Sequence, residues 1–237
     1  MKIMSDNTGL SREKLLLLDL DGVLVTDGVG DTKVGSEIIA IHPNLIEQLE
    51  ALSVPIAILT HRSRGEALQI IQALDLSNHK FLGIFTANDI FIYGLRFKGV
   101  SFLIKNGSRK SIVLSYINKR FNIPAANIAF IDDRLGNVED LLDAGVGLGI
   151  NVPAAKVIEG GKIETFELSK ALDQVETWCK QDILSKQPDT VTCLPVVSLD
   201  LASDAASGIF LKRRWWDWFG LGRSGLRHSR QLILRLL

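Results

Sequence analysis

The apolar positions of this chain fall into short runs that are separated by segments with helical spacing. Two of these runs, at 15–18 and 54–59, are almost continuously apolar and end at polar residues. Runs of this length predict strands that are buried on both faces, as in the middle of a parallel sheet. Similar runs at 81–86, 127–131 and 145–150 bring the predicted strands to five.

Helical patterns lie between these strands. Apolar residues recur on one helix face at 38–52, 66–74, 110–121 and 137–144. Strands that alternate with helices favour a parallel sheet with right-handed crossovers and helices on its faces. We therefore expect the α/β class, with a Rossmann-like sheet flanked by helices.

Two apolar segments lie outside this alternation. Residues 90–104 are interrupted by Gly94 and Gly99, and they predict a short hairpin or a continuation of the third strand. Residues 162–186 predict a further amphipathic helix. We therefore assign 1–186 to one domain, and the motifs considered below all lie within 13–152.

The C-terminal part of the chain differs in composition. Prolines and several Ser and Thr make 187–204 a predicted linker, followed by a tail at 205–237. The whole chain has 27 Lys and Arg against 27 Asp and Glu. Its neutral net charge gives no specific indication of nucleic-acid binding.

The charge is unevenly distributed along the chain. Residues 209–237 hold seven Lys or Arg and a single acid, a net charge of +6, which leaves −6 for 1–208. Three of the four Trp residues also lie in the tail. A basic aromatic segment suits a membrane interface or a protein partner. The alternative is a C-terminal helical extension that folds back on the domain.

Targeting features and disulfides are not indicated. Cys179 and Cys193 have no His or Cys at zinc-ligand spacing, and we interpret both as reduced thiols. The first residues lack the apolar core of a signal peptide, and no stretch reaches the roughly 18 apolar residues of a membrane span. We expect a cytoplasmic protein, either free or peripheral at a membrane.

Paired carboxylates follow two of the predicted strands. Asp19 and Asp21 come after the first strand, and Asp132 and Asp133 after the strand at 127–131. Ligands of open α/β sheets bind where the carboxyl ends of the strands meet, so up to four carboxylates should converge there. So many like charges require a cation, and hard oxygen ligands suit Mg²⁺.

The first of these acidic segments resembles a known motif. Asp19-Leu20-Asp21-Gly22-Val23 is similar to the first motif of the haloacid dehalogenase (HAD) superfamily, in which an apolar strand precedes Asp-x-Asp-Gly. An Asp-x-Asp-Gly also occurs in solvated turns and in calcium loops. A calcium loop needs further oxygen ligands, whereas apolar residues follow at 23–25.

Three further positions resemble the remaining HAD motifs. Thr60 ends the second strand, as the hydroxyl of the second motif does, and Asp132-Asp133 resembles the fourth motif. The third motif is a Lys near the start of the preceding helix. Lys110 lies 23 residues before Asp133 and is our choice, with Lys105 as the other candidate.

The resemblance implies a Mg²⁺-dependent phosphohydrolase that works through an aspartyl-phosphate. It makes Asp19 the nucleophile and Asp21 the general acid and base, which dehalogenases lack. The phosphate would be held by Thr60, His61, Arg62 and Lys110. The implied Mg²⁺ ligands are Asp19, Asp21 through its carbonyl, Asp132 and Asp133.

The resemblance also implies a minimal cap, because neither insertion point has room for a large one. Lids usually exclude water from small substrates. An open site favours a phosphate on a phosphoprotein or nucleic acid, or one held by another subunit, with small phosphomonoesters as the alternative. A rival interpretation is a catalytically silent HAD-like adaptor that presents the tail, but all four motif positions are filled.

Overall fold

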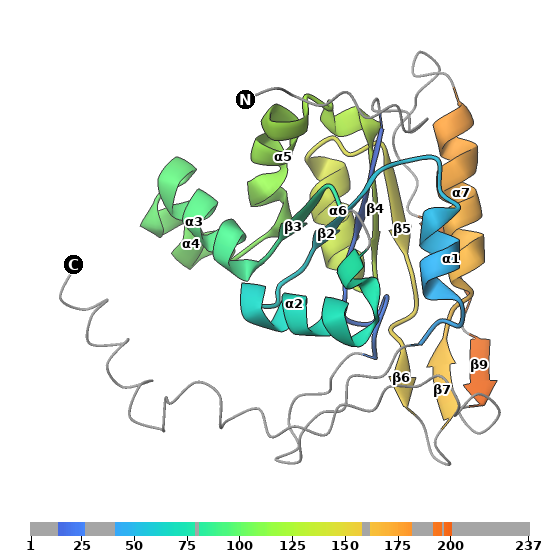
Figure 1. Ribbon diagram of the computed structural model, residues 1–237. Helices are drawn as coiled ribbons and strands as arrows, with labels where there is room; N and C mark the ends of the chain where they lie inside the picture. The colour runs from blue at the N-terminus through green and yellow to red at the C-terminus, as the bar shows by residue number, and fades with distance from the viewer. Residues whose placement is uncertain are drawn as a thin grey trace, which may run out of the picture.

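The computed structural model describes residues 14–26, 41–78, 81–157, 162–181, 192–195 and 197–200. A six-stranded parallel sheet with the order β3-β2-β1-β4-β5-β8 forms its centre (Figure 1). Its strands are β1 (Leu15–Leu18), β2 (Ile56–Leu59), β3 (Gly83–Phe85), β4 (Ile128–Asp132), β5 (Leu148–Asn151) and β8 (Thr192–Cys193). The predicted α/β class is confirmed.

Helices cover both faces of this sheet. The α-helices are α1 (Leu45–Glu50), α2 (Arg64–Ala73), α3 (Ala87–Phe97), α4 (Val100–Asn106), α5 (Leu114–Phe121), α6 (Leu135–Asp143) and α7 (Leu168–Lys180). Short 3₁₀ helices are η1 (Leu76–Asn78), η2 (Lys110–Val113) and η3 (Ala125–Asn127). Within the described ranges, no helix combines the length and apolar character needed to cross a membrane.

The apolar run of β1 is explained by burial on both sides of the sheet. Leu16 and Leu18 pack in one core with side chains of α1, α2 and α7. Leu15 and Leu17 face the opposite core, which contains side chains of α3, α5 and α6. Figure 1 shows α1 and α7 together on one side of the sheet. All four leucines are fully buried, so no position of the strand faces water.

The register brings the carboxyl ends of neighbouring strands to one edge. Leu18 of β1 pairs with Ile58 of β2 and with Ile131 of β4. One residue later, the Asp19 N–H donates to the Ile131 carbonyl at 3.1 Å. The polar residues that end β1, β2 and β4 therefore lie at the same edge.

A second, smaller sheet differs from the sequence predictions. The strands β6 (Lys156–Val157), β7 (Lys162–Thr165) and β9 (Val197–Asp200) form an antiparallel sheet with the order β6-β7-β9. The predicted helix at 162–186 is wrong at its start, because α7 begins only at Leu168. Buried Ile163 and Thr165 alternate there with polar residues, which is the period of a strand.

The segment at 187–204, predicted to be a linker, contains β8 and β9. The Leu194 N–H extends the β5–β8 pairing by donating to the Asn151 carbonyl at 3.1 Å. β-Branched residues such as Thr192 and Val197 suit this role. The domain boundaries stay a prediction, and the tail at 205–237 lies outside the described residues.

The hairpin or strand predicted for 90–104 is wrong, because this segment forms most of α3 and α4. Gly94 lies inside α3, where a Cβ atom would stand 2.5 Å from the Leu103 Cδ2 atom of α4. Gly99 has a φ of +82° and separates the two helices. The glycines therefore permit a close crossing and a tight turn between helices.

His42 lies buried before α1 and gives the fold a pH dependence. Its Nε2–H donates to the Val23 carbonyl at 2.7 Å, and burial lowers the pKa of His42 from 6.5 to about 4. Between these values the unfolded chain binds more protons than the folded chain. This contribution to stability is therefore complete above pH 6.5 and is lost as the pH falls towards 4.

We expect the contribution of His42 to reach about 3 kcal/mol. The His42→Gln variant keeps an N–H donor but has no titrating group, so its free energy of unfolding should fall less between pH 7 and pH 4.5. Urea unfolding of both proteins at the two pH values measures this difference. If the wild type and His42→Gln lose the same free energy of unfolding between pH 7 and pH 4.5, His42 is not the source of this pH dependence.

Candidate active site

Asp19 stands at the end of β1, at the edge where the strands converge. Its side chain is 8% exposed. The Oδ1 atom accepts a hydrogen bond from the Leu20 N–H at 2.8 Å, and Oδ2 lies 2.9 Å from the Lys110 Nζ. The backbone bond fixes one carboxylate oxygen and leaves the other directed at the ammonium.

Asp132 ends the neighbouring strand, β4, and is fully buried. Its Oδ1 accepts from the Arg134 N–H at 2.8 Å, and both carboxylate oxygens accept from the Asn137 Nδ2 at 3.1 and 3.0 Å. Asn137 did not figure among the predicted site residues. Its position in the first turn of α6, just after the paired acids, is the signal that could have found it.

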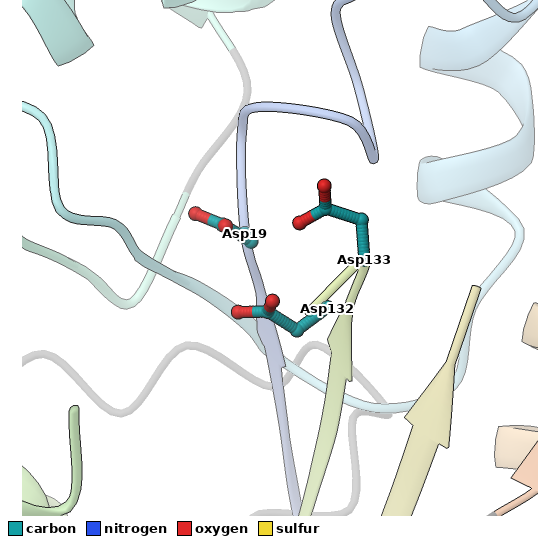
Figure 2. A group of neighbouring side chains, drawn as sticks. All are labelled: Asp19, Asp132 and Asp133. Atoms are coloured by element: carbon teal, nitrogen blue, oxygen red, sulfur yellow. The ribbon is translucent and has the colours of Figure 1, made fainter. Parts of the chain in front are cut away.

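Three carboxylates gather at these two strand ends (Figure 2). Ligand oxygens of Asp19, Asp132 and Asp133 all lie within 4.8 Å of one another. Gly22 makes room for this approach, because a Cβ atom on it would collide with the Asp133 carboxylate. Gly22 also has a φ of +72°, which favours glycine.

Lys110 supplies the positive charge of this cluster. It is fully buried, and its Nζ lies 2.6 Å from the Asp132 Oδ2 and 2.9 Å from the Asp19 Oδ2. Burial alone would lower the pKa of Lys110, but the two carboxylates outweigh burial and raise it. The other candidate, Lys105, lies exposed on α4.

Carboxylates dominate this cluster. Ligand oxygens of three acids gather here, and two of these acids, Asp19 and Asp132, are buried. Burial raises the pKa of Asp19 to about 7, opposed by Lys110 and reinforced by Asp132. A set of carboxylate oxygens suits Mg²⁺. The donor set therefore fits the predicted metal.

Asp21 lies apart from the three-carboxylate cluster. Its Oδ1 accepts from the Arg62 Nε at 3.1 Å and Nη2 at 2.6 Å, and its Oδ2 accepts from Nε at 2.9 Å. Asp21 is absent from the group of candidate metal-binding carboxylates among the described residues. Of the up to four carboxylates expected to converge, three form this group, and the side chain of the fourth pairs with Arg62.

Thr60 and His61 shape the loop between β2 and α2. Thr60 is fully buried, and its Oγ1 accepts from the Arg62 N–H at 3.2 Å. The His61 Nε2 donates to the Ser108 carbonyl at 2.7 Å, which connects this loop to the loop before Lys110. Ser63 caps α2 in a reciprocal capping box with Glu66. Thr60 and Arg62 thus lie at a well-formed helix start beside the acids.

No family model matches this sequence, and no curated protein matches it either. Among similar solved structures, the 3-deoxy-D-manno-octulosonate 8-phosphate phosphatase of Moraxella catarrhalis, in complex with magnesium, phosphate and KDO, is 22% identical. It has a TM-score of 0.35, and the match covers 60% of this chain and 69% of that chain.

Two further structures are similar over comparable lengths. A HAD-superfamily hydrolase from Geobacter sulfurreducens is 13% identical with a TM-score of 0.41, covering 58% of this chain and 88% of that chain. The cobalt-bound deoxy-D-mannose-octulosonate 8-phosphate phosphatase of Haemophilus influenzae is 17% identical with a TM-score of 0.38. The match covers 59% of this chain and 68% of that chain. Phosphatases and HAD-superfamily hydrolases thus recur among the solved structures similar to this chain.

Proposed function

We propose that this protein is a Mg²⁺-dependent phosphohydrolase that cleaves phosphomonoesters through an aspartyl-phosphate on Asp19. One observation carries the proposal. The buried Lys110 ammonium lies between Asp19 and Asp132, at a cluster that also includes the Asp133 carboxylate. Such a centre combines a carboxylate nucleophile with cationic partners for a phosphoryl group.

The metal would be held by Asp19, Asp132 and Asp133, with the Asp21 carbonyl as the further predicted ligand. Asn137 and the Arg134 N–H keep Asp132 oriented for this role. When bound, Mg²⁺ supplies Lewis-acid polarisation of the phosphoryl oxygens and neutralises their charge. The residues of the chain perform the remaining chemistry.

In the first step, an oxygen of the Asp19 carboxylate attacks phosphorus and the bond to the leaving oxygen breaks. Asp21 gives its proton to that leaving oxygen. In the second step, Asp21 takes a proton from water, the water oxygen attacks phosphorus, and the bond to Asp19 breaks to release phosphate. Lys110 and Thr60 hold the phosphoryl oxygens throughout.

Arg62 has two roles in this scheme. In the structure it pairs with Asp21, which cannot donate a proton while both of its oxygens accept bonds from the guanidinium. The Arg62 side chain is 29% exposed, so it has room to turn towards an arriving phosphate. A guanidinium binds phosphate oxygens in a bidentate manner, and this exchange would release Asp21 for proton transfer.

The Arg62→Lys variant should therefore raise the KM for a phosphomonoester by about tenfold or more, because an ammonium cannot bind in the same bidentate way. Steady-state kinetics measure the change. Arg64→Lys is the matched control, since Arg64 is exposed in the first turn of α2. Unchanged kcat and KM in Arg62→Lys would remove Arg62 from the phosphate site.

We further propose that the phosphate is carried by a large molecule or presented by a partner. The connection from β3 to Lys110 holds only α3 and α4. With no large lid in this described connection, the bulk of a macromolecule would have to exclude water from the strand edge. Small soluble phosphomonoesters are the alternative substrates.

A phosphatase panel tests the function. Phosphopeptides, nucleotides, sugar phosphates and lipid phosphates are offered to the full chain with Mg²⁺ and again with EDTA. We expect phosphate release from at least one class with Mg²⁺ and its loss with EDTA. Release that is unaffected by EDTA would contradict the metal assignment. No release from any class would favour the silent adaptor.

A further inference from the structure

Large apolar side chains are exposed along the outside of α3 and α4, a region that we call the hairpin surface. Its six apolar members are between 38% and 78% exposed, namely Phe91, Ile92, Leu95, Phe97, Val100 and Ile104. The proposed hydrolysis uses none of them. Exposed apolar clusters of this kind mark sites of interaction with a protein or a membrane.

The hairpin surface follows from the helical geometry. Phe91, Ile92 and Leu95 lie on one face of α3, and Val100 and Ile104 are one helical turn apart on α4. The opposite side of α3 is buried and includes Ile90 and Gly94. Figure 1 shows the two helices side by side at one end of the molecule, away from α1 and α7.

Positive charge accompanies these apolar side chains. Residues 90–106 contain three Lys or Arg and no Asp or Glu. Arg96, Lys98 and Lys105 are exposed on the two helices or the turn between them. The nearest acid in the sequence, Asp89, accepts hydrogen bonds from the Thr86 N–H and hydroxyl, both at 2.9 Å. The hairpin surface is therefore both apolar and cationic.

Charge distinguishes between the candidate occupants. A second copy across a two-fold axis would bring identical cationic surfaces together. The segment at 209–237 has a net charge of +6, so it would also be repelled. Nucleic acid would satisfy the cations, but it offers no apolar environment to Ile92, Val100 and Ile104. Anionic lipids satisfy both features, because acyl chains receive apolar side chains and headgroups attract cations.

We propose that the hairpin surface docks this protein on a bilayer that contains anionic lipids.

The start of α3 also contacts the loop that carries Arg62. The Ala87 N–H donates to the Arg62 carbonyl at 3.0 Å, and the Asn88 side chain accepts from the Arg64 N–H at 3.2 Å. The hairpin surface is therefore connected to the proposed phosphate site through the start of α3.

Vesicle sedimentation of the full chain tests this proposal. Vesicles of phosphatidylcholine with phosphatidylserine are compared with vesicles of phosphatidylcholine alone. We expect binding to the mixed vesicles only. The double variants Ile92→Ser with Ile104→Ser, and Lys98→Gln with Lys105→Gln, should each lower the partition coefficient by at least about tenfold.

A matched control removes the same charge elsewhere. Lys156→Gln with Lys170→Gln changes exposed lysines of β6 and α7 and should bind as the wild type does. Circular dichroism and Tm establish that every variant is folded. The proposal is overturned if the wild type binds neither vesicle, or if hairpin variants bind normally, which would place the anchor elsewhere. A wild-type dimer that these variants dissociate, without vesicle binding, would identify a second copy as the occupant.

Discussion

Asp19→Asn should lower phosphatase turnover by at least about a thousandfold, because an amide is not a competent nucleophile. The substitution should leave the fold intact. Burial already disfavours the charged carboxylate and raises the pKa of Asp19 to about 7, so a neutral side chain of the same shape suits the position. Steady-state phosphate release and thermal unfolding measure the two effects.

Asp173→Asn provides the control for this experiment. Asp173 is exposed on α7 and should tolerate the same chemical change with unaltered turnover. Wild-type rates in a folded Asp19→Asn protein would exclude Asp19 as the nucleophile. A large loss of stability in Asp19→Asn would instead show that its charge is needed to hold the cluster together.

Lys110→Met should reduce both turnover and stability. Removing the ammonium leaves the carboxylates of Asp19 and Asp132 without their cationic partner, which costs about 3–5 kcal/mol at a buried site. This loss corresponds to a fall in Tm of roughly 10 °C in EDTA. Turnover should fall by at least about a hundredfold, because the phosphoryl oxygens also lose a cation.

Lys105→Met removes a lysine from the exposed side of α4 and serves as the matched variant. Its Tm and turnover should remain close to those of the wild type. Thermal scans with EDTA and with Mg²⁺ separate the two effects, since a bound cation should recover part of the stability that Lys110→Met loses. Equal consequences for the two lysines would refute the placement of Lys110 at the phosphate site.

Strand positions could be predicted wherever both faces of a strand are buried. The run at β1 has no polar residue because a core lies on each side of it. β8 is different, since it is two residues long and takes its place only by pairing with β5. A segment of this length has no periodicity of its own, so its sequence resembles that of a linker.

The error at 90–104 has a physical cause that the hairpin surface explains. An amphipathic helix is recognised because its apolar residues lie on one side only. α3 is apolar on the buried side, at Ile90, and also on the exposed side, at Phe91 and Ile92. The helical period is therefore obscured, and the glycines suggested a turn between strands.

The candidate site was predictable where it depends on strand order. Asp19 and Asp132 come together because β1 and β4 are neighbours in the parallel sheet. The pair between Asp21 and Arg62 was not predictable, since it depends on how two loops approach each other across 41 residues of sequence. The catalytic and binding roles of all these residues stay predictions.

Trapping the covalent intermediate tests the central claim most directly. Asp21→Asn should slow both steps, but the first step needs little help from a general acid when the leaving group is a good one such as p-nitrophenolate. With Mg²⁺ and p-nitrophenyl phosphate, the intermediate should therefore accumulate in this variant. After acid quenching, mass spectrometry should find a hydroxylamine-sensitive phosphate on the peptide that contains Asp19. A phosphate on another residue, or wild-type turnover with no trapped phosphate in either protein, would contradict the aspartyl-phosphate mechanism.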